Sequence, residues 1–240
     1  MGLDINVLAR PTAGHEQEFE DLLRQFRLLA RGQVPTDGPY VDPGKTSLFG
    51  LKKSKPVFDE EAAKRRFAEL SQPAYVTLNA PQVGRDAEAD AWVRAAFEEG
   101  RFDLPSAEQA LDALKGYYAL EAMEPCDGFP VYSHAYMYDG VDRTSFRGAF
   151  LTECEKVLEP EILNRAWEIM TAEELAQWSK ALLAVADRLA GENGFEHVLG
   201  DQAFRTDDPG ALPGQIHIID QAGRWAAFWS SRGHGAEPYF

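Results

Sequence analysis

The sequence predicts a single α+β domain in which a mixed or antiparallel sheet packs against about six to seven helices. Two observations support this fold class. Apolar residues recur at helical spacing in some segments and alternate as in strands in others, and both kinds of segment occur along the whole chain. The chain has 240 residues, of which 45% are hydrophobic, so it can bury one large core. The expected domain spans residues 1–240, with an irregular loop at residues 32–58.

The N-terminal residues are expected to form a strand and then a helix. Residues 3–9 have a strand pattern, and the segment after Gly14 carries an apolar stripe at helical spacing. The stripe consists of Phe19, Leu22, Leu23, Phe26 and Leu29. This order resembles the strand-helix start of small ferredoxin-like domains, and the resemblance concerns architecture alone, without an activity.

Residues 32–58 form the longest segment without a regular pattern, apart from a short strand that is expected at residues 47–51. The prolines that interrupt it are Pro35, Pro39, Pro43 and Pro56. The stretch from Gly38 to Thr46 is similar to a phosphate-binding Gly-x-x-x-x-Gly-Lys-Thr loop, but five residues separate its glycines and no helix is expected after it, so a turn is the better interpretation. The segment also contains a basic patch formed by Lys45, Lys52, Lys53 and Lys55. It is either a solvated loop, or a lid or contact loop.

Capping residues predict helices in the middle of the chain. The expected helices are 60–70 after Asp59, 87–99 after Asp86, and 107–121 after Ser106. Residues 74–80 are expected to form a strand between the first two.

The C-terminal half is expected to contain three more helices. They cover residues 145–158, a segment from Pro160, and a segment from Thr171 that ends before Gly191. The last of these has the strongest pattern, and its regular apolar positions are expected in the core: Leu175, Trp178, Leu182, Val185 and Leu189.

A β-hairpin is expected near the C-terminus. Residues 215–220 and 224–231 flank a turn, and both segments are rich in apolar and aromatic residues. In a strand, the offset of three between His217 and Asp220 sends their side chains to opposite faces, so the two are not expected to act as a pair. The last residues, 232–240, either fray or tuck against the body of the protein.

The charge balance argues against two classes of partner. The chain has 24 basic and 39 acidic side chains and a net charge of -15, so its surface repels phosphate backbones and anionic lipids. Neither nucleic acid nor a membrane is expected as a partner. The chain has no apolar run of about 18 to 20 residues and no secretion signal at its start, so it is expected in the cytoplasm. The 16 arginines against 8 lysines fit a bacterium with a GC-rich genome.

The acidic excess is largest in residues 126–240, which have 9 basic and 18 acidic side chains. This excess either keeps a surface well hydrated or attracts a basic protein partner. In the second case, the association rate should fall steeply with salt, because exposed charges are screened over about 8 Å at physiological ionic strength.

No cofactor or metal site is expected. Cys126 and Cys154 are too far apart for a Cys-x-x-Cys motif, and each is expected to be a buried free thiol. The five histidines are dispersed, without His-Glu-x-x-His spacing. His15 precedes Glu16 and Glu18, but the helix dipole explains acidic residues in a first turn, so a metal is not favoured there.

Residues 127–148 contain the candidate binding site. In a strand over residues 130–138, alternation places Tyr132, His134, Tyr136 and Tyr138 on one face. Tyrosine rings, which carry hydroxyls, together with an imidazole, suit a cleft wall or a sheet face that is partly exposed to water. A turn is expected next, followed by a helix that is capped by a hydroxyl at position 144 or 145. The free backbone amides at the start of this helix are expected near the end of the row of tyrosines and His134.

Two arginines complete this candidate site. Arg143 and Arg147 stand four apart across the expected helix start, where the helix dipole disfavours cations, so a bound anion would relieve the repulsion and accept bidentate hydrogen bonds. The hypothesis is a site for a carboxylate- or phosphate-bearing small molecule, lined by Tyr132, His134 and Tyr136 and anchored by the two arginines. In the alternative, nearby carboxylates already pair with both arginines.

Two functions remain open from the sequence. The first is a small-molecule binding protein or enzyme with a cleft beside residues 127–148, and the second is a non-catalytic acidic protein, of inhibitor or immunity type, that binds a basic protein partner. The first requires a concave pocket, and the second requires a broad acidic surface. Binding is favoured over catalysis, because no nucleophile, base and orienting group stand in a recognisable spacing, but the sequence does not decide whether the protein is an enzyme.

Overall fold

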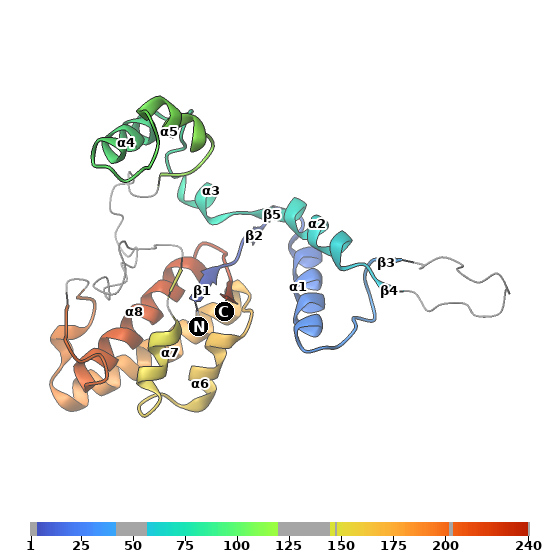
Figure 1. Cartoon of the computed structure of the whole chain (residues 1–240). Coiled ribbons are helices and arrows are strands. Elements are labelled where there is room, and N and C mark those ends of the chain that lie inside the picture. Colours follow the sequence, from blue (N-terminus) through green and yellow to red (C-terminus); the bar gives the residue numbers. More distant parts are fainter. Residues whose placement is uncertain (1–3, 42–56, 120–144, 147, 202–203, 240) are drawn as a thin grey trace, which may run out of the picture. The chain divides into compact units, whose positions relative to one another are not determined.

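The computed structural model describes residues 4–41, 57–119, 145–146, 148–201 and 204–239 (Figure 1). The chain divides into two units. The larger unit contains Met1–Leu8 and Pro73–Phe240, and the smaller unit contains Ala9–Gln72. The single domain over residues 1–240 stays a prediction.

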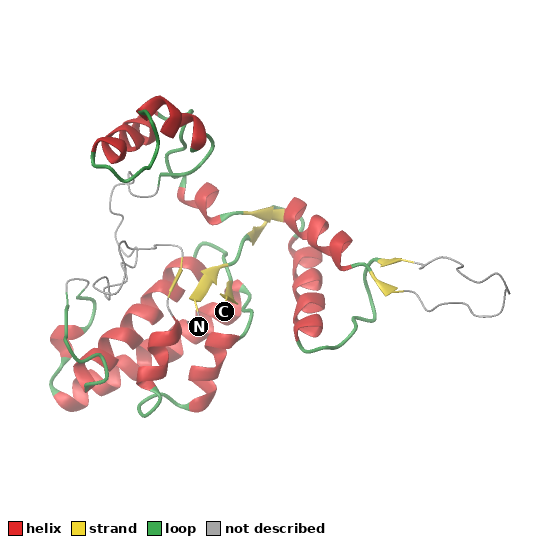
Figure 2. Cartoon of the chain, viewed as in Figure 1, coloured by secondary structure: helices red, strands yellow, loops and turns green. Residues whose placement is uncertain are grey.

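Helices predominate in the described residues, and the strands are short (Figure 2). All pairings between the described strands are antiparallel. This confirms the α+β class with antiparallel strands. A ferredoxin-like start is not shown, because the first strand, β1, belongs to the larger unit and the first helix, α1, belongs to the smaller one.

The larger unit contains a three-stranded sheet in the order β6-β1-β7. Its strands are β1 (Asp4–Val7), β6 (Ser145–Phe146) and β7 (Ala236–Tyr239). The central residue Ile5 pairs with Phe146 on one side and with Pro238 on the other. Ile5 and Phe146 are both buried, so the sheet is part of the core. The strand predicted at residues 3–9 is therefore confirmed, with shorter bounds.

The C-terminal residues tuck into the larger unit. His234 is fully buried, with Nδ1 2.8 Å from the carbonyl oxygen of Leu8 and Nε2 2.7 Å from the hydroxyl of Thr77. Beyond it, Ala236 and Met170 exchange two backbone hydrogen bonds of 3.0 and 2.8 Å. These bonds join residues 234–236 to three distant segments of the unit, at Leu8, Thr77 and Met170, which decides between the two alternatives that the sequence left open.

The smaller unit is built on a pair of helices. Its elements are β2 (Arg10–Pro11), α1 (Glu16–Ala30), β3 (Tyr40–Val41), β4 (Val57–Phe58), α2 (Glu60–Leu70) and β5 (Ser71–Gln72). Phe67 joins the helices: its ring stacks on Phe19 at 4.6 Å and meets Phe26 edge-on at 5.4 Å. The carboxylate of Asp59 accepts a hydrogen bond from the backbone amide of Ala62, so the predicted cap and the predicted bounds of α2 are confirmed.

The segment after Pro73 forms three helices. They are α3 (Ala74–Leu78), α4 (Ala87–Glu98) and α5 (Ala107–Ala113). Two of them, α4 and α5, surround a small core of their own. The core residues are Val83, Ala89, Val93, Ala110 and Ala119. The strand predicted at residues 74–80 is wrong, because a short apolar run fits a strand and a helix equally well. The helix predicted to reach residue 121 ends at Ala113, although Ser106 caps its start as expected.

The segment that follows β6 was also predicted incorrectly. A helix was expected over residues 145–158, but Ser145–Phe146 are a strand, and a 3₁₀ helix, η3, covers Gly148–Cys154. The apolar face of the expected helix consists of Phe146, Phe150, Cys154 and Val157. The first three are buried and Val157 is partly buried, so the pattern predicted the inward side chains but not the backbone conformation. The elements after them are α6 (Pro160–Asn164), η4 (Arg165–Trp167) and, further on, η5 (Glu196–Val198).

A pair of long helices forms the main core of the larger unit. α7 (Ala172–Asn193) lies beside α8 (Leu212–Ser230) (Figure 1). Thr171 and Glu174 form the predicted capping box, and α7 ends at Gly194 in a left-handed conformation rather than before Gly191. The helices approach closely at Gly223, whose carbonyl oxygen accepts a 2.8 Å hydrogen bond from the hydroxyl of Ser179.

The hairpin predicted at residues 215–231 is wrong, because residues 215–230 belong to α8. Its buried residues lie on all sides of the helix, so no amphipathic stripe marks it as helical. Isoleucines and aromatic residues then favoured the strand interpretation. The proline at position 213, in the first helical turn, is the feature that pointed to a helix. None of the described helices is both long and apolar enough to cross a membrane.

Cys154 is a free, fully buried thiol, as predicted, and lies 3.6 Å from the carbonyl oxygen of Gln215. Burial raises the pKa of this thiol to about 12. Thiolate is the reactive form, so in a Cys126→Ser variant the remaining thiol should react with a disulfide reagent at pH 8 at least about 100-fold more slowly in the native state than in urea. Equal rates would show that Cys154 is accessible.

Candidate functional site

The residues of the predicted anion site lie outside the described residues. They are Tyr132, His134, Tyr136, Arg143 and Arg147. Cys126 and the four lysines of the predicted basic patch also lie outside them. The binding role of the five site residues stays a prediction. One argument for it is wrong, because Ser145–Phe146 form a strand, so these two residues are not part of the helix that was expected to begin there.

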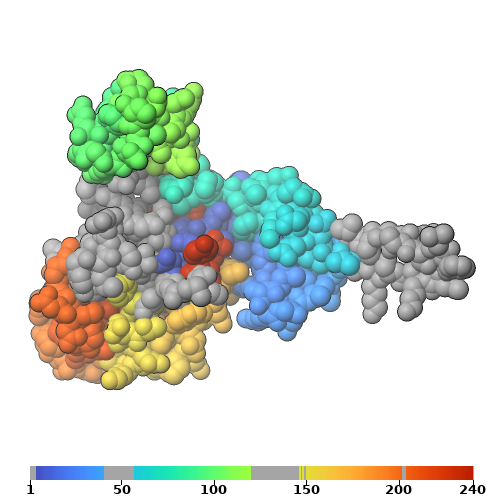
Figure 3. Space-filling view, viewed as in Figure 1, coloured from blue at the N-terminus to red at the C-terminus, as the bar shows by residue number. Residues whose placement is uncertain are grey.

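A described pocket lies in the smaller unit, between α1, α2 and the loop that leads into β3. It has a volume of about 470 Å³. Its lining residues are Glu18, Asp21, Leu22, Gln25, Asp37, Gly38, Pro39, Ala62, Ala63 and Arg66. Figure 3 shows α1 in blue and α2 in cyan where they meet on the surface of this unit. We call this site the α1–α2 pocket.

The spacing along α1 explains one wall of the pocket. The lining residues of α1 follow one another at offsets of three, one and three positions, which places all four on one face of a helix. They are Glu18, Asp21, Leu22 and Gln25. The opposite wall comes from α2, and the loop residues Asp37–Pro39 complete it. The sequence predicted both helices, but not the position of this loop.

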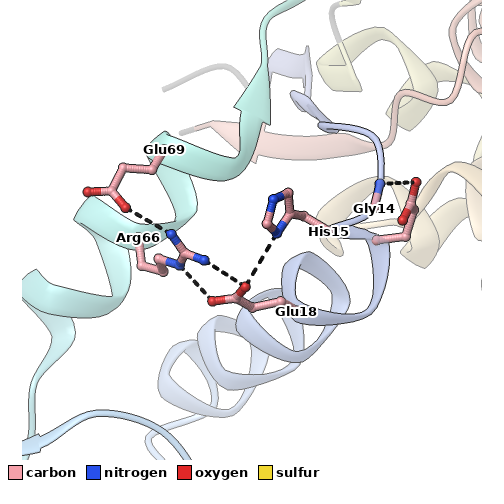
Figure 4. Close-up of polar contacts among 6 residues, drawn as sticks. Gly14, His15, Glu18, Arg66 and Glu69 are labelled. Atoms are coloured by element: carbon pink, nitrogen blue, oxygen red, sulfur yellow. Dashed lines mark hydrogen bonds and ion pairs between the residues drawn. The ribbon is translucent and has the colours of Figure 1, made fainter.

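An arginine from α2 contacts the first carboxylate of the pocket. Arg66 donates from Nε and Nη2 to the two oxygens of Glu18, at 2.6 and 2.8 Å, and from Nη1 to Glu69 at 3.1 Å (Figure 4). This hydrogen bonding holds the pKa of Glu18 below its ordinary value and raises that of Arg66. The pair is about half exposed, so it contributes little to stability and serves mainly to orient the carboxylate.

The same contacts bear on the metal site that was considered at His15. Nδ1 of His15 lies 3.7 Å from Oε2 of Glu18, but both oxygens of Glu18 already accept hydrogen bonds from Arg66. Glu16 turns back to accept a hydrogen bond from the backbone amide of Gly14. Within the described ranges, no group of three histidine, cysteine, aspartate or glutamate residues is arranged to hold a metal ion.

A second arginine holds two carboxylates at the other end of the pocket. Nη2 of Arg24 lies 2.6 Å from Oδ2 of Asp37 and 3.1 Å from Oδ1 of Asp21. The hydrogen bond from Arg24 lowers the pKa of Asp37, so this carboxylate stays ionised at neutral pH. In the part of the chain that the structure describes, Asp21 accepts hydrogen bonds at Oδ1 alone, from Arg24 and Gln17. Its Oδ2 is therefore an available acceptor.

Gln25 supplies a further acceptor from one turn along α1. Its side chain is 5% exposed and lines the pocket, and among the described residues its Oε1 accepts no hydrogen bond. Gly38 packs against this amide: with a positive φ of 132°, it leaves no room for a Cβ atom, which would lie 3.0 Å from Oε1 of Gln25 and 2.7 Å from the ring of Phe58. A buried unpaired amide oxygen is unfavourable, so it marks a place where a donor is missing.

The polar side chains of α8 form a second group of interest, which the sequence interpretation missed. On a helix, an offset of three places His217 and Asp220 on the same side, contrary to the strand prediction. Asp220 is 1% exposed, and its Oδ2 accepts hydrogen bonds from the amide of Gly200, from Nε of Arg224 and from Nε2 of Gln221, at 2.8, 2.8 and 3.3 Å. These contacts tie a loop to the helix, which is a structural role.

Comparisons with models of known protein families, with curated proteins and with solved structures found no match to this chain.

Proposed function

We propose that this protein is a small-molecule binding protein whose α1–α2 pocket takes a ligand with a positively charged nitrogen. The observation that carries this proposal is the surplus of acceptors: three carboxylates line the pocket, two arginines donate hydrogen bonds to them, and Asp21 has an oxygen that the described residues leave available. The volume of about 470 Å³ falls in the range of small-molecule sites. The ligand class thus differs from the anion that the sequence favoured for residues 127–148.

Calorimetric titration of the whole chain tests this proposal. The probes are agmatine and 1,5-diaminopentane, which carry cationic groups, and glutarate, an anion of similar length. We expect both cations to bind and their affinity to fall about tenfold in Asp21→Asn, since a charge-assisted hydrogen bond is lost. Glu20→Gln is the control, because Glu20 is an exposed carboxylate of the same helix that does not line the pocket.

The anion separates this proposal from the earlier prediction. Absence of cation binding would contradict the proposed function. Glutarate binding that is unchanged in Asp21→Asn, and lost in His134→Ala or Arg147→Ala, would instead support the site predicted at residues 127–148.

The distribution of charge favours a second candidate, an acidic interaction protein that binds a basic protein partner. The larger unit has 13 basic and 29 acidic side chains, whereas the smaller unit has 11 and 10. The whole acidic excess therefore belongs to the larger unit, and electrostatic attraction of a basic partner would act there. The steep salt dependence of association expected from the sequence applies to this candidate.

A further inference from the structure

Resting on the proposed function, we infer that the α1–α2 pocket selects a guanidinium group over an ammonium group. Its ligand is then either the arginine side chain of a polypeptide or a small guanidino compound. Four features of the described residues carry this inference: the directions of the acceptors, the cations that already contact them, the apolar lining and the unpaired amide.

The acceptors approach from different elements. Asp21 and Gln25 lie one turn apart on α1, and Asp37 lies in the loop before β3. The carboxylates of Asp21 and Asp37 converge on a single nitrogen, Nη2 of Arg24. A guanidinium group has five donors in one plane and can serve several separated acceptors at once, whereas an ammonium group has three donors on one atom.

Two guanidinium groups already donate hydrogen bonds to the carboxylates of the pocket. Arg66 places two nitrogens on the two oxygens of Glu18, and Arg24 places two nitrogens on the two oxygens of Asp37. The described lysine of α2, Lys64, pairs instead with Glu60 and Glu61, neither of which lines the pocket. The carboxylates of the pocket are thus held in orientations that suit a planar, forked donor.

The remaining lining is apolar and suits a flat cation. Leu22, Pro39, Ala62 and Ala63 present hydrocarbon to the pocket. A guanidinium group is more weakly hydrated than an ammonium group and can lay its face on such a surface. The free-energy cost of transfer from water into this pocket is therefore higher for an ammonium group than for a guanidinium group.

Gln25 is the residue that we expect to determine specificity. Its amide is buried and its oxygen is unpaired among the described residues, but the terminal amide of glutamine turns about χ3 with little resistance. A guanidinium group that is bound by Asp21 has further N–H groups left, and one of them can reach an acceptor one turn along the helix. An ammonium group has all three donors on one nitrogen. When it donates to Asp21 and Asp37, its remaining donor therefore extends less far towards Gln25 than the N–H groups of a guanidinium group do.

Titration of the whole chain with three matched probes tests the inference. The probes are N-acetyl-arginine methylamide, the corresponding lysine compound, and the neutral citrulline compound, which keeps the shape of arginine without its charge. We expect the arginine probe to bind about tenfold more tightly than the lysine probe, and the citrulline probe to bind most weakly. Gln25→Met should lower the affinity for arginine about tenfold and leave that for lysine nearly unchanged, while Glu20→Gln should alter neither.

The outcomes separate the inference from the proposed function. If none of the cationic probes binds, the proposed function fails. If the arginine and lysine probes bind equally, or if Gln25→Met weakens both alike, the pocket binds cations without selecting guanidinium, and the inference fails while the proposed function stands. Circular dichroism of each variant establishes that it is folded.

Two further probes distinguish the sources of the guanidinium group. A pentapeptide with a central arginine between glycines that binds more tightly than agmatine would identify a polypeptide ligand. Tighter binding of agmatine would identify a small guanidino compound.

Discussion

Replacement of Gly235 by alanine should destabilise the larger unit by about 3 kcal/mol or more, or prevent it from folding. A Cβ atom at this position would lie 2.1 Å from the carbonyl oxygen of Met170, which is far inside van der Waals contact. That oxygen accepts the backbone hydrogen bond of Ala236, and the carbonyl oxygen of Gly235 accepts that of Leu8. The chain cannot move away from the clash without breaking one of these bonds, because it is held by backbone groups of Met170 and Leu8 rather than by flexible side chains.

Intrinsic fluorescence during urea unfolding measures this effect, since all five tryptophans lie in the larger unit. Gly191→Ala is the matched control. Gly191 lies inside α7 with open space around its Cα, so alanine should stabilise the helix there by about 0.5 to 1 kcal/mol. Equal effects of the two substitutions would show that β7 does not pack on Met170 as described.

The sequence predicted the helices that have an apolar stripe or a capping residue. α1, α2 and α7 were found this way: Phe19 and Leu22 define the stripe of the first, Asp59 caps the second, and Thr171 caps the third. Both kinds of evidence are local, because a cap and a stripe depend on residues within a few turns of one another.

The sequence did not predict the elements that depend on distant partners. β6 has two residues, and it is a strand because Phe146 pairs with Ile5, far away along the chain. α8 is surrounded by packing, so its apolar residues show no helical stripe. The α1–α2 pocket combines both cases: spacing explains the wall from α1, but no local pattern places Asp37 and Gly38 opposite it.

The incorrect hairpin had a consequence for Asp220, because it placed this residue at the end of a strand, next to the turn. In α8 the carboxylate is buried and accepts three hydrogen bonds at Oδ2, from Gly200, Gln221 and Arg224. A buried carboxylate needs such donors, and the donors in turn lose their partner when it is removed.

Asp220→Ala should therefore destabilise the larger unit by about 2 to 3 kcal/mol. The effect should not be larger, because Arg224 is 45% exposed and its guanidinium group can turn to water once the carboxylate is gone. Asp220→Asn keeps an acceptor for the amide of Gly200, so it should cause a smaller loss. Asp187→Ala, at an exposed site on α7, is the control and should change the free energy of unfolding by less than about 0.5 kcal/mol. Urea unfolding followed by tryptophan fluorescence gives all three values, and an Asp220→Ala variant as stable as the control would mean that the loop at Gly200 is not held by α8.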